Sequence, residues 1–158
     1  MSHKLTCHCG AVELKVDLTD GFNTARRCDC SFCRRRGAIA VSAPLDGVQI
    51  VKGADKLTLY QWGTNTAKHY FCSVCGIYTH HKRRSDPTQY GVNVAALEGV
   101  NPRDLGEVLW TDGVNHPSDR TCLQGCGSAN VHKIKKATFE TGCLSVCSFL
   151  AKISNAPP

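Results

Sequence analysis

Cysteine is the residue type in this chain with the clearest capacity for chemistry. The sequence holds 11 cysteines in 158 residues, and three tight clusters lie within its first half. These clusters are Cys7 with Cys9, Cys28 with Cys30 and Cys33, and Cys72 with Cys75. Closely spaced thiols in a reducing compartment are typical of metal ligands. The alternative, buried apolar cysteine, is common in proteins but gives no reason for clustering.

Two of the clusters are pairs, and a glycine follows each pair. Residues two apart in a strand point to the same face, so Cys7 and Cys9 can share one ion. Gly10 and Gly76 can adopt the left-handed conformation that a tight turn around a cation needs. Two such pairs predict a zinc ion held by four cysteines. Spacing alone leaves open which pairs share a metal.

Three cysteines remain when the two pairs are taken together. Structural zinc has four protein ligands, whereas catalytic zinc usually has three and an open position for water or substrate. We therefore expect Cys28, Cys30 and Cys33 to form an open, catalytic-type site. Two alternatives stay open: one of these thiols is unrelated to the site, or a fourth ligand such as His69 closes it.

The elements that position these cysteines are expected to be mainly strands. Residues 12–18 alternate apolar and polar side chains, which is the period of a half-buried strand. Further candidates, separated by Gly, Asp and Asn turns, are 48–51, 57–62, 69–71, 77–80 and 90–94. This pattern predicts an antiparallel all-β architecture.

Helix signals are few. A short helix is expected from Ser31 as N-cap to Gly37, and its dipole and Arg34–Arg36 would stabilise neighbouring thiolates. A helical turn is expected after Asn101. His80 and His81 are expected in a surface loop, and Trp62 and Trp110 in the core.

The cysteine segments resemble those of a known family. Thr6–Val12, Cys28–Arg34 and Phe71–Gly76 match the glutathione-dependent formaldehyde-activating enzyme family, which also includes centromere protein V, in order, spacing and flanking residues. The resemblance extends over roughly residues 4–116. It implies a mainly β fold, a β-tent of antiparallel sheets scaffolded by zinc, with little helix. We accordingly expect a domain over 1–118 and an atypical extension of unknown role over 119–158.

The resemblance also implies two zinc ions per chain. One is structural and bound by Cys7, Cys9, Cys72 and Cys75, and the other is catalytic in type and bound by Cys28, Cys30 and Cys33. The implied activity is that of a carbon–sulfur lyase that joins glutathione, or another thiol, to an aldehyde such as formaldehyde. Cations that could hold the glutathione carboxylates are Arg34, Arg35, Arg36, Lys82, Arg83 and Arg84. The alternative function is a non-enzymatic zinc-scaffolded binding module.

Composition narrows the class of protein further. Charged residues make up 20% of the chain and hydrophobic residues 42%, which is a globular composition. The net charge of +6 favours anionic partners but is far below that of a dedicated nucleic-acid binder. With no long apolar run and no apolar leader, we expect a cytoplasmic protein without a membrane span. The sequence indicates no oligomeric state.

Four cysteines lie outside the resemblance. Cys122 with Cys126 and Cys143 with Cys147 form twin pairs, each with three residues between the partners. On helices each pair would lie on one face, where it could bind a third metal or form disulfides. Gly125, Gly127 and Gly142 argue against regular helices there.

Overall fold

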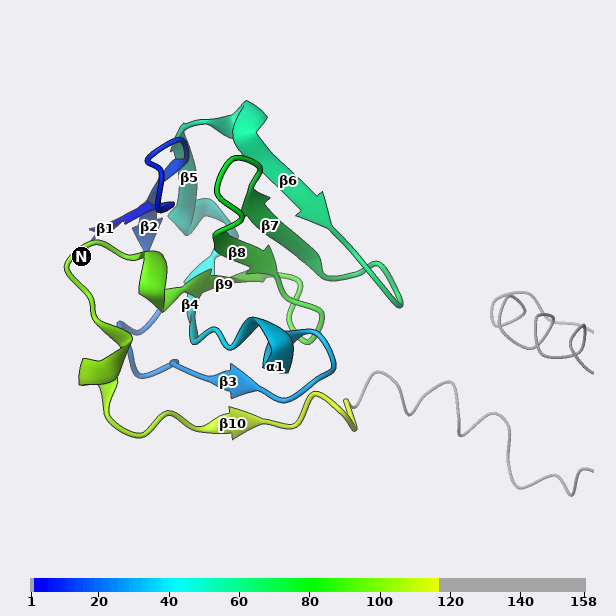
Figure 1. Cartoon of the computed structure of the whole chain (residues 1–158). Coiled ribbons are helices and arrows are strands. Elements are labelled where there is room, and N and C mark those ends of the chain that lie inside the picture. The colour runs from blue at the N-terminus through cyan, green and yellow to red at the C-terminus, as the bar shows by residue number, and fades with distance from the viewer. Residues whose placement is uncertain (1, 117–158) are drawn as a thin grey trace, which may run out of the picture. The chain divides into compact units, whose positions relative to one another are not determined.

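The computed structural model describes residues 2–116 of the chain (Figure 1). These belong to a compact unit over Met1–Val114 and to the start of a second unit, Asn115–Pro158. The twin cysteine pairs expected at 122–147 lie outside the described residues. The domain boundary expected at 118 therefore stays a prediction. Among residues 2–116, no helix is both long and apolar enough to cross a membrane.

The described unit is mainly β, as the sequence predicts. Ten strands appear: β1 (Ser2–Thr6), β2 (Glu13–Asp17), β3 (Arg27–Cys28), β4 (Ala40–Pro44), β5 (Val48–Lys52), β6 (Leu57–Tyr60), β7 (Lys68–Cys72), β8 (Tyr78–Lys82), β9 (Gln89–Asn93) and β10 (Trp110–Thr111). They form a three-stranded sheet β1-β2-β5, a five-stranded sheet β4-β9-β8-β7-β6, and the pair β10-β3. The two larger sheets are antiparallel, which confirms the expected architecture.

Helical segments are short. They are α1 (Cys33–Arg36) and the 3-10 turns η1 (Leu45–Gly47), η2 (Ala54–Lys56), η3 (Val94–Ala96) and η4 (Pro102–Leu105). The turn expected after Asn101 is confirmed, because the Asn101 side chain accepts a hydrogen bond from the Arg103 N–H.

The three-stranded sheet follows directly from the alternation in residues 12–18. Leu14 and Val16 of β2 are fully buried, whereas Lys15 and Asp17 are exposed. This central strand therefore buries one face only. β5 is an edge strand, and its Ile50 and Val51 are exposed.

The core lies where the two larger sheets contribute their apolar side chains. Its fully buried members include Leu5, Val12, Leu14 and Val16 near β1 and β2, and Val41, Val92 and Val94 near β4 and β9. Burial of an aliphatic side chain of this size contributes about 1.5–3 kcal/mol before the entropy of ordering it. The two cysteine-bearing turns that flank β1 and β7 join this core through Cys7 and Cys72, which are also buried.

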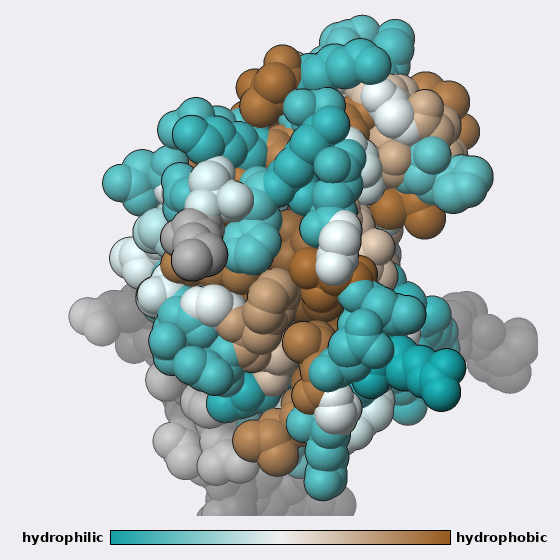
Figure 2. Space-filling model, turned by 90° about the vertical axis from the view of Figure 1, so that its left-hand side faces the viewer, coloured by the Kyte–Doolittle hydropathy of each residue, from teal (hydrophilic) through white to brown (hydrophobic). Residues whose placement is uncertain are grey.

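Some apolar surface remains outside the core. Figure 2 shows the face on the left of Figure 1, where hydrophobic side chains form a band between hydrophilic margins. Trp62 is 38% exposed and Trp110 is 62% exposed, so the expectation that both lie in the core is wrong. Trp110 instead receives the Arg27 guanidinium over its ring, 5.8 Å from the ring centroid.

Candidate metal centres

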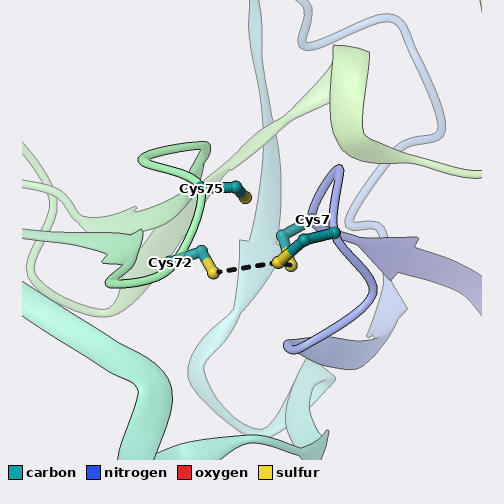
Figure 3. A group of neighbouring side chains, drawn as sticks. Cys7, Cys72 and Cys75 are labelled. Carbon is teal, nitrogen blue, oxygen red and sulfur yellow. Dashed lines mark hydrogen bonds between the residues drawn. The ribbon is translucent and has the colours of Figure 1, made fainter.

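The two cysteine pairs converge although more than 60 residues separate them in the sequence. Cys7 and Cys9 lie in the turn between β1 and β2, and Cys72 and Cys75 lie at the turn between β7 and β8. Their sulfur atoms all lie within 4.8 Å of one another. Figure 3 shows the side chains of Cys7, Cys72 and Cys75 directed toward a common point. We refer to these four cysteines as the four-sulfur group.

The spacing of these sulfur atoms fits a tetrahedral metal ion. The Sγ atoms of Cys7 and Cys9 are 3.6 Å apart, and those of Cys9 and Cys72 are 3.7 Å apart. Zinc with four Zn–S bonds of about 2.3 Å in tetrahedral geometry separates its sulfurs by about 3.8 Å. The group can therefore hold a metal ion of this size with little rearrangement.

Backbone N–H groups around the four-sulfur group favour thiolates. The Val12 N–H donates to the Cys7 Sγ at 3.2 Å. Donors from Ile77 and Cys9 lower the pKa of Cys75 to about 6. The turn is closed by Gly76, whose φ of 72° is left-handed, as the glycine after each pair predicts. Such donors hold sulfur ligands in their anionic, metal-binding form.

The remaining three cysteines form a second group, the three-cysteine group. Cys28 ends β3, Cys30 lies in the following turn, and Cys33 begins α1. Their sulfur atoms also lie within 4.8 Å of one another. Within residues 2–116, no histidine or carboxylate joins them at that distance, and His69 is among those that do not. The group thus offers three ligands to a metal ion.

Charge in the three-cysteine group is shared unequally. The Cys33 thiol donates a hydrogen bond that lowers the pKa of Cys28 to about 6, and the same bond raises the pKa of Cys33. The Cys33 N–H also donates to the Cys30 Sγ at 3.3 Å. One thiolate is therefore favoured near neutral pH before any metal is bound.

The local helix differs from its prediction. α1 has only four residues, its N-cap is Phe32 rather than Ser31, and no side chain caps it. A helix this short has a negligible dipole, so it does not supply the expected stabilisation of the thiolates. Its end is as predicted: Gly37 has φ 68° and donates its N–H to the Cys33 carbonyl at 2.9 Å.

A segment far along the chain packs against the three-cysteine group. β10 pairs in parallel with β3, so that Thr111 lies beside Cys28. The next residues bring Gly113 onto the group, where its N–H donates to Asp29 Oδ1 at 2.7 Å. A Cβ on Gly113 would overlap the Cys28 Sγ and lie 2.8 Å from the Cys30 Cβ. Sequence analysis missed this role, because nothing local links Gly113 to Cys28.

Arg36 connects the three-cysteine group to the five-stranded sheet. Its guanidinium lies over the Tyr78 ring at 3.6 Å and contacts the Cys33 Sγ at 3.6 Å. It also donates to His69 Nδ1 at 3.3 Å. Burial and the Arg36 charge lower the pKa of His69 to about 4, so this imidazole is neutral near pH 7. A buried, polar layer thus lies next to the cysteines.

His81 extends this layer along the sheet. It pairs with His69 across β7 and β8, and their rings stack at 5.0 Å. Its Nδ1 lies 2.5 Å from the Tyr78 hydroxyl, which also donates to the Gly91 carbonyl at 3.1 Å. The ring fits here because Gly91, its partner on β9, has no side chain. Sequence analysis did not find this arrangement.

His80 also departs from its prediction. It is buried in β8, stacks on Tyr70 at 4.6 Å and meets Tyr90 at 5.2 Å. Burial lowers the pKa of His80 to about 4. The expectation of a surface loop for His80 and His81 is therefore wrong. Neighbouring strands supply enough aromatic surface and hydrogen bonds to hold both rings inside the sheet.

The six cations expected to meet carboxylates differ in exposure. Arg34 and Arg35 are exposed on α1, whereas Arg36, Lys82, Arg83 and Arg84 are partly buried. Arg35 donates to the Ser31 carbonyl, and the Arg83 N–H donates to the Gln89 carbonyl at 3.1 Å. The cations therefore belong to two segments, α1 and the end of β8 with the turn after it.

Comparison with known proteins agrees with these observations. The sequence profile of the glutathione-dependent formaldehyde-activating enzyme family matches residues 2–113. This match spans more than half of the chain, so the chain belongs to that family. The family predicted from the cysteine motifs is thereby confirmed.

Two related proteins are informative. A curated Halomonas elongata protein bearing the same family name is 34% identical over 79 residues, which are 44% of this chain and 49% of that protein. The chain thus spans about half the length of this relative. A Rhodobacter sphaeroides protein of known crystal structure is 72% identical, with a TM-score of 0.68 over 68% of this chain and 99% of the other. The likeness to the solved structure supports the fold described above.

Proposed function

We propose that this chain is a zinc-dependent enzyme of the carbon–sulfur lyase type. It would join glutathione, or another thiol, to an aldehyde such as formaldehyde. The observation that carries the proposal is the pair of separate sulfur groups, one with four ligands and one with three. A closed group suits a structural ion, and a group of three leaves a position for substrate. Membership of the family supports the choice of thiol and aldehyde.

The same geometry supports an assignment of ligands to each ion. Cys7, Cys9, Cys72 and Cys75 would hold the structural zinc, and Cys28, Cys30 and Cys33 would hold the catalytic-type zinc. Two zinc ions per chain are then expected. Sulfur donors of this kind and number select zinc over harder cations such as Mg²⁺ or Ca²⁺.

The proposed reaction is an addition across a carbonyl. When bound, zinc would supply a positive centre that favours the thiolate form of the substrate and polarises the aldehyde. The thiolate sulfur forms a bond to the carbonyl carbon, and the π electron pair of the C=O bond moves to oxygen. That oxygen takes up the proton that the thiol released, so atoms and charge balance without an oxidant or a reductant.

The chain's own residues would prepare this addition. The hydrogen bond from Cys33 keeps negative charge on Cys28, and Gly113 fixes the loop that carries Cys28 and Cys30. Exposed Arg34 and Arg35 on α1 are near in sequence to the cysteines and could bind the carboxylates of glutathione. We also propose a cytoplasmic location, because thiols remain reduced there.

Exchange spectroscopy by NMR tests the activity. Formaldehyde and glutathione combine reversibly without an enzyme, so the measured quantity is the rate of exchange between free glutathione and its hydroxymethyl adduct. We expect this rate to rise in proportion to the concentration of zinc-loaded protein. Cys30→Ser protein, prepared in the same way, should give the uncatalysed rate.

The same measurement separates the enzyme from the binding module. A wild-type protein with two zinc ions that leaves the exchange rate unchanged would contradict the enzyme proposal. Screening several small thiols and aldehydes in the same assay distinguishes a wrong substrate from an absent activity. Failure with every pair would favour the zinc-scaffolded binding module.

A further inference from the structure

Three consecutive arginines on α1 have different environments. Successive residues of a helix point about 100° apart, so three in a row cannot share one face. Arg34 and Arg35 are exposed, and Arg36 is turned toward the five-stranded sheet. Gly37 ends the helix immediately afterwards in a left-handed conformation. The fold therefore selects one arginine of the three for an interior position.

Aromatic rings fix the Arg36 guanidinium in that position. It lies 3.6 Å from the centroid of the Tyr78 ring and 5.2 Å from that of Phe32. Both contacts are of the cation–π type, which is strongest where water is excluded. Tyr78 is itself buried and held by hydrogen bonds to His81 and Gly91. The positive charge of Arg36 is therefore held in a fixed position.

The polar contacts of Arg36 leave one of its hydrogen-bond donors without a partner. Two of its nitrogens contact the Cys33 Sγ and His69 Nδ1. Its Nε is the one buried side-chain nitrogen or oxygen in the described residues that has no hydrogen-bond partner. Within residues 2–116, no carboxylate forms an ion pair with Arg36. The Arg36 guanidinium therefore contacts a group that becomes an anion when it binds a metal, namely the Cys33 sulfur.

This arrangement has an electrostatic consequence for the three-cysteine group. A divalent ion with three thiolates has a net charge of about −1, which disfavours a further anion. The Arg36 charge compensates that excess at contact distance from Cys33. We propose that Arg36 is a specificity-determining residue that makes the fourth ligand position of this group prefer an anion, such as a substrate thiolate, over a neutral ligand. This inference rests on the proposed function and names the charge state of the substrate that it selects.

Anion and neutral probes on the cobalt-loaded full-length chain test the inference. Cobalt(II) in a sulfur site absorbs visible light, so a new ligand changes the spectrum of the open group. Thiocyanate serves as the anion and imidazole as the neutral ligand, and glutathione is titrated separately. The variants are Arg36→Gln, which removes the charge, and Arg36→Lys, which keeps it. Lys15→Gln is the control, because it removes an exposed positive charge from β2, a strand that carries no cysteine of this group.

We expect Arg36→Gln to hold as much cobalt as the wild type and to bind thiocyanate about tenfold more weakly. Its affinity for imidazole should stay within about twofold, and Arg36→Lys should retain most of the thiocyanate affinity. Lys15→Gln should match the wild type. Equal weakening of both probes, unchanged thiocyanate binding, or loss of cobalt from Arg36→Gln would each overturn the inference.

A different result would contradict the proposed function while leaving the inference about Arg36 intact. If the wild type binds thiocyanate but not glutathione or other thiols, the thiol reaction is excluded while the anion preference set by Arg36 stands. A wild type that binds none of the probes would refute both.

Discussion

Gly113→Ala is the substitution that most sharply separates the packing of the three-cysteine group from general stability. Gly113 lies against this group from a segment 80 residues away from Cys33 in the sequence. An added Cβ would overlap the Cys28 Sγ and lie 2.8 Å from the Cys30 Cβ and 3.1 Å from the Cys30 nitrogen. Ordinary carbon contacts are about 3.5–4.0 Å, so the loop must move by about 1 Å.

These distances set the expected loss of folding stability and of bound metal. Overpacking by one methyl group typically costs about 1–3 kcal/mol. A shift of about 1 Å also exceeds the tolerance of about 0.2 Å for metal–ligand distances, so metal binding by Cys28 should be impaired. We expect the variant to lose about 2 kcal/mol, equivalent to a fall of about 10 °C in Tm, and about one metal ion per chain.

Metal analysis of purified protein and thermal unfolding are the two measurements. Gly91→Ala is the matched control, because its Cβ would overlap the His81 ring but no cysteine. It should lower Tm by a similar amount with both metal ions retained. A Gly113→Ala protein with the wild-type metal content and Tm would refute the packing that we describe. Metal loss from Gly91→Ala would show that metal content falls with any loss of stability, so that it would not report on the three-cysteine group in particular.

Three further predictions concern other parts of the chain. Cys75→Ser should leave the protein insoluble or loosely folded, because structural zinc contributes on the order of 10 kcal/mol to folding, and a well-folded variant with full zinc would contradict the four-sulfur assignment. Truncation after Arg120 should leave the Tm and metal content of the compact unit Met1–Val114 unchanged, and unfolding of the shorter chain would show that the extension completes the core. The pKa of His80 falls from 6.5 to about 4 on folding, so its contribution to stability is complete above pH 6.5 and is lost as the pH falls toward 4. His80→Phe keeps an aromatic ring beside Tyr70. In this variant, the free energy of unfolding measured in urea should depend less steeply on pH over that range, by about 1 kcal/mol per pH unit. An unchanged slope would exclude His80 as the cause.

Local patterns in the sequence predict most of the longer strands and the cysteine clusters. Alternation in residues 12–18 indicates β2, and apolar or β-branched runs indicate β5 through β9. Cysteines two or three residues apart indicate metal-ligand clusters, and the family resemblance implies how the clusters combine; the structure brings the sulfur atoms of both groups together. Strands β3 and β10 are not predicted, because each has only two residues and they pair with each other across more than 80 residues of sequence.

The surroundings of the three-cysteine group could not be predicted for the same reason. The register that stacks His69 on His81 belongs to the β7–β8 pairing. An irregularity in that pairing brings Tyr78 opposite Phe71, where Phe71 contacts Phe32 and Tyr78 lies under the Arg36 guanidinium. Nothing in the run of three arginines shows which one points inward, because α1 is too short to have an amphipathic pattern.

Metal content of the wild type and of Cys30→Ser, measured together with Tm, tests the central claim most directly. If Cys28, Cys30 and Cys33 hold a separate zinc ion, the wild type contains about two zinc ions per chain and the variant about one, with little change in Tm. The variant leaves the four-sulfur group intact, so that group should still hold its ion and join the sheets in both proteins. An unchanged zinc content in the variant would contradict the three-cysteine site. Global unfolding of the variant would instead make this zinc structural, and the binding module would then be the better account of the protein.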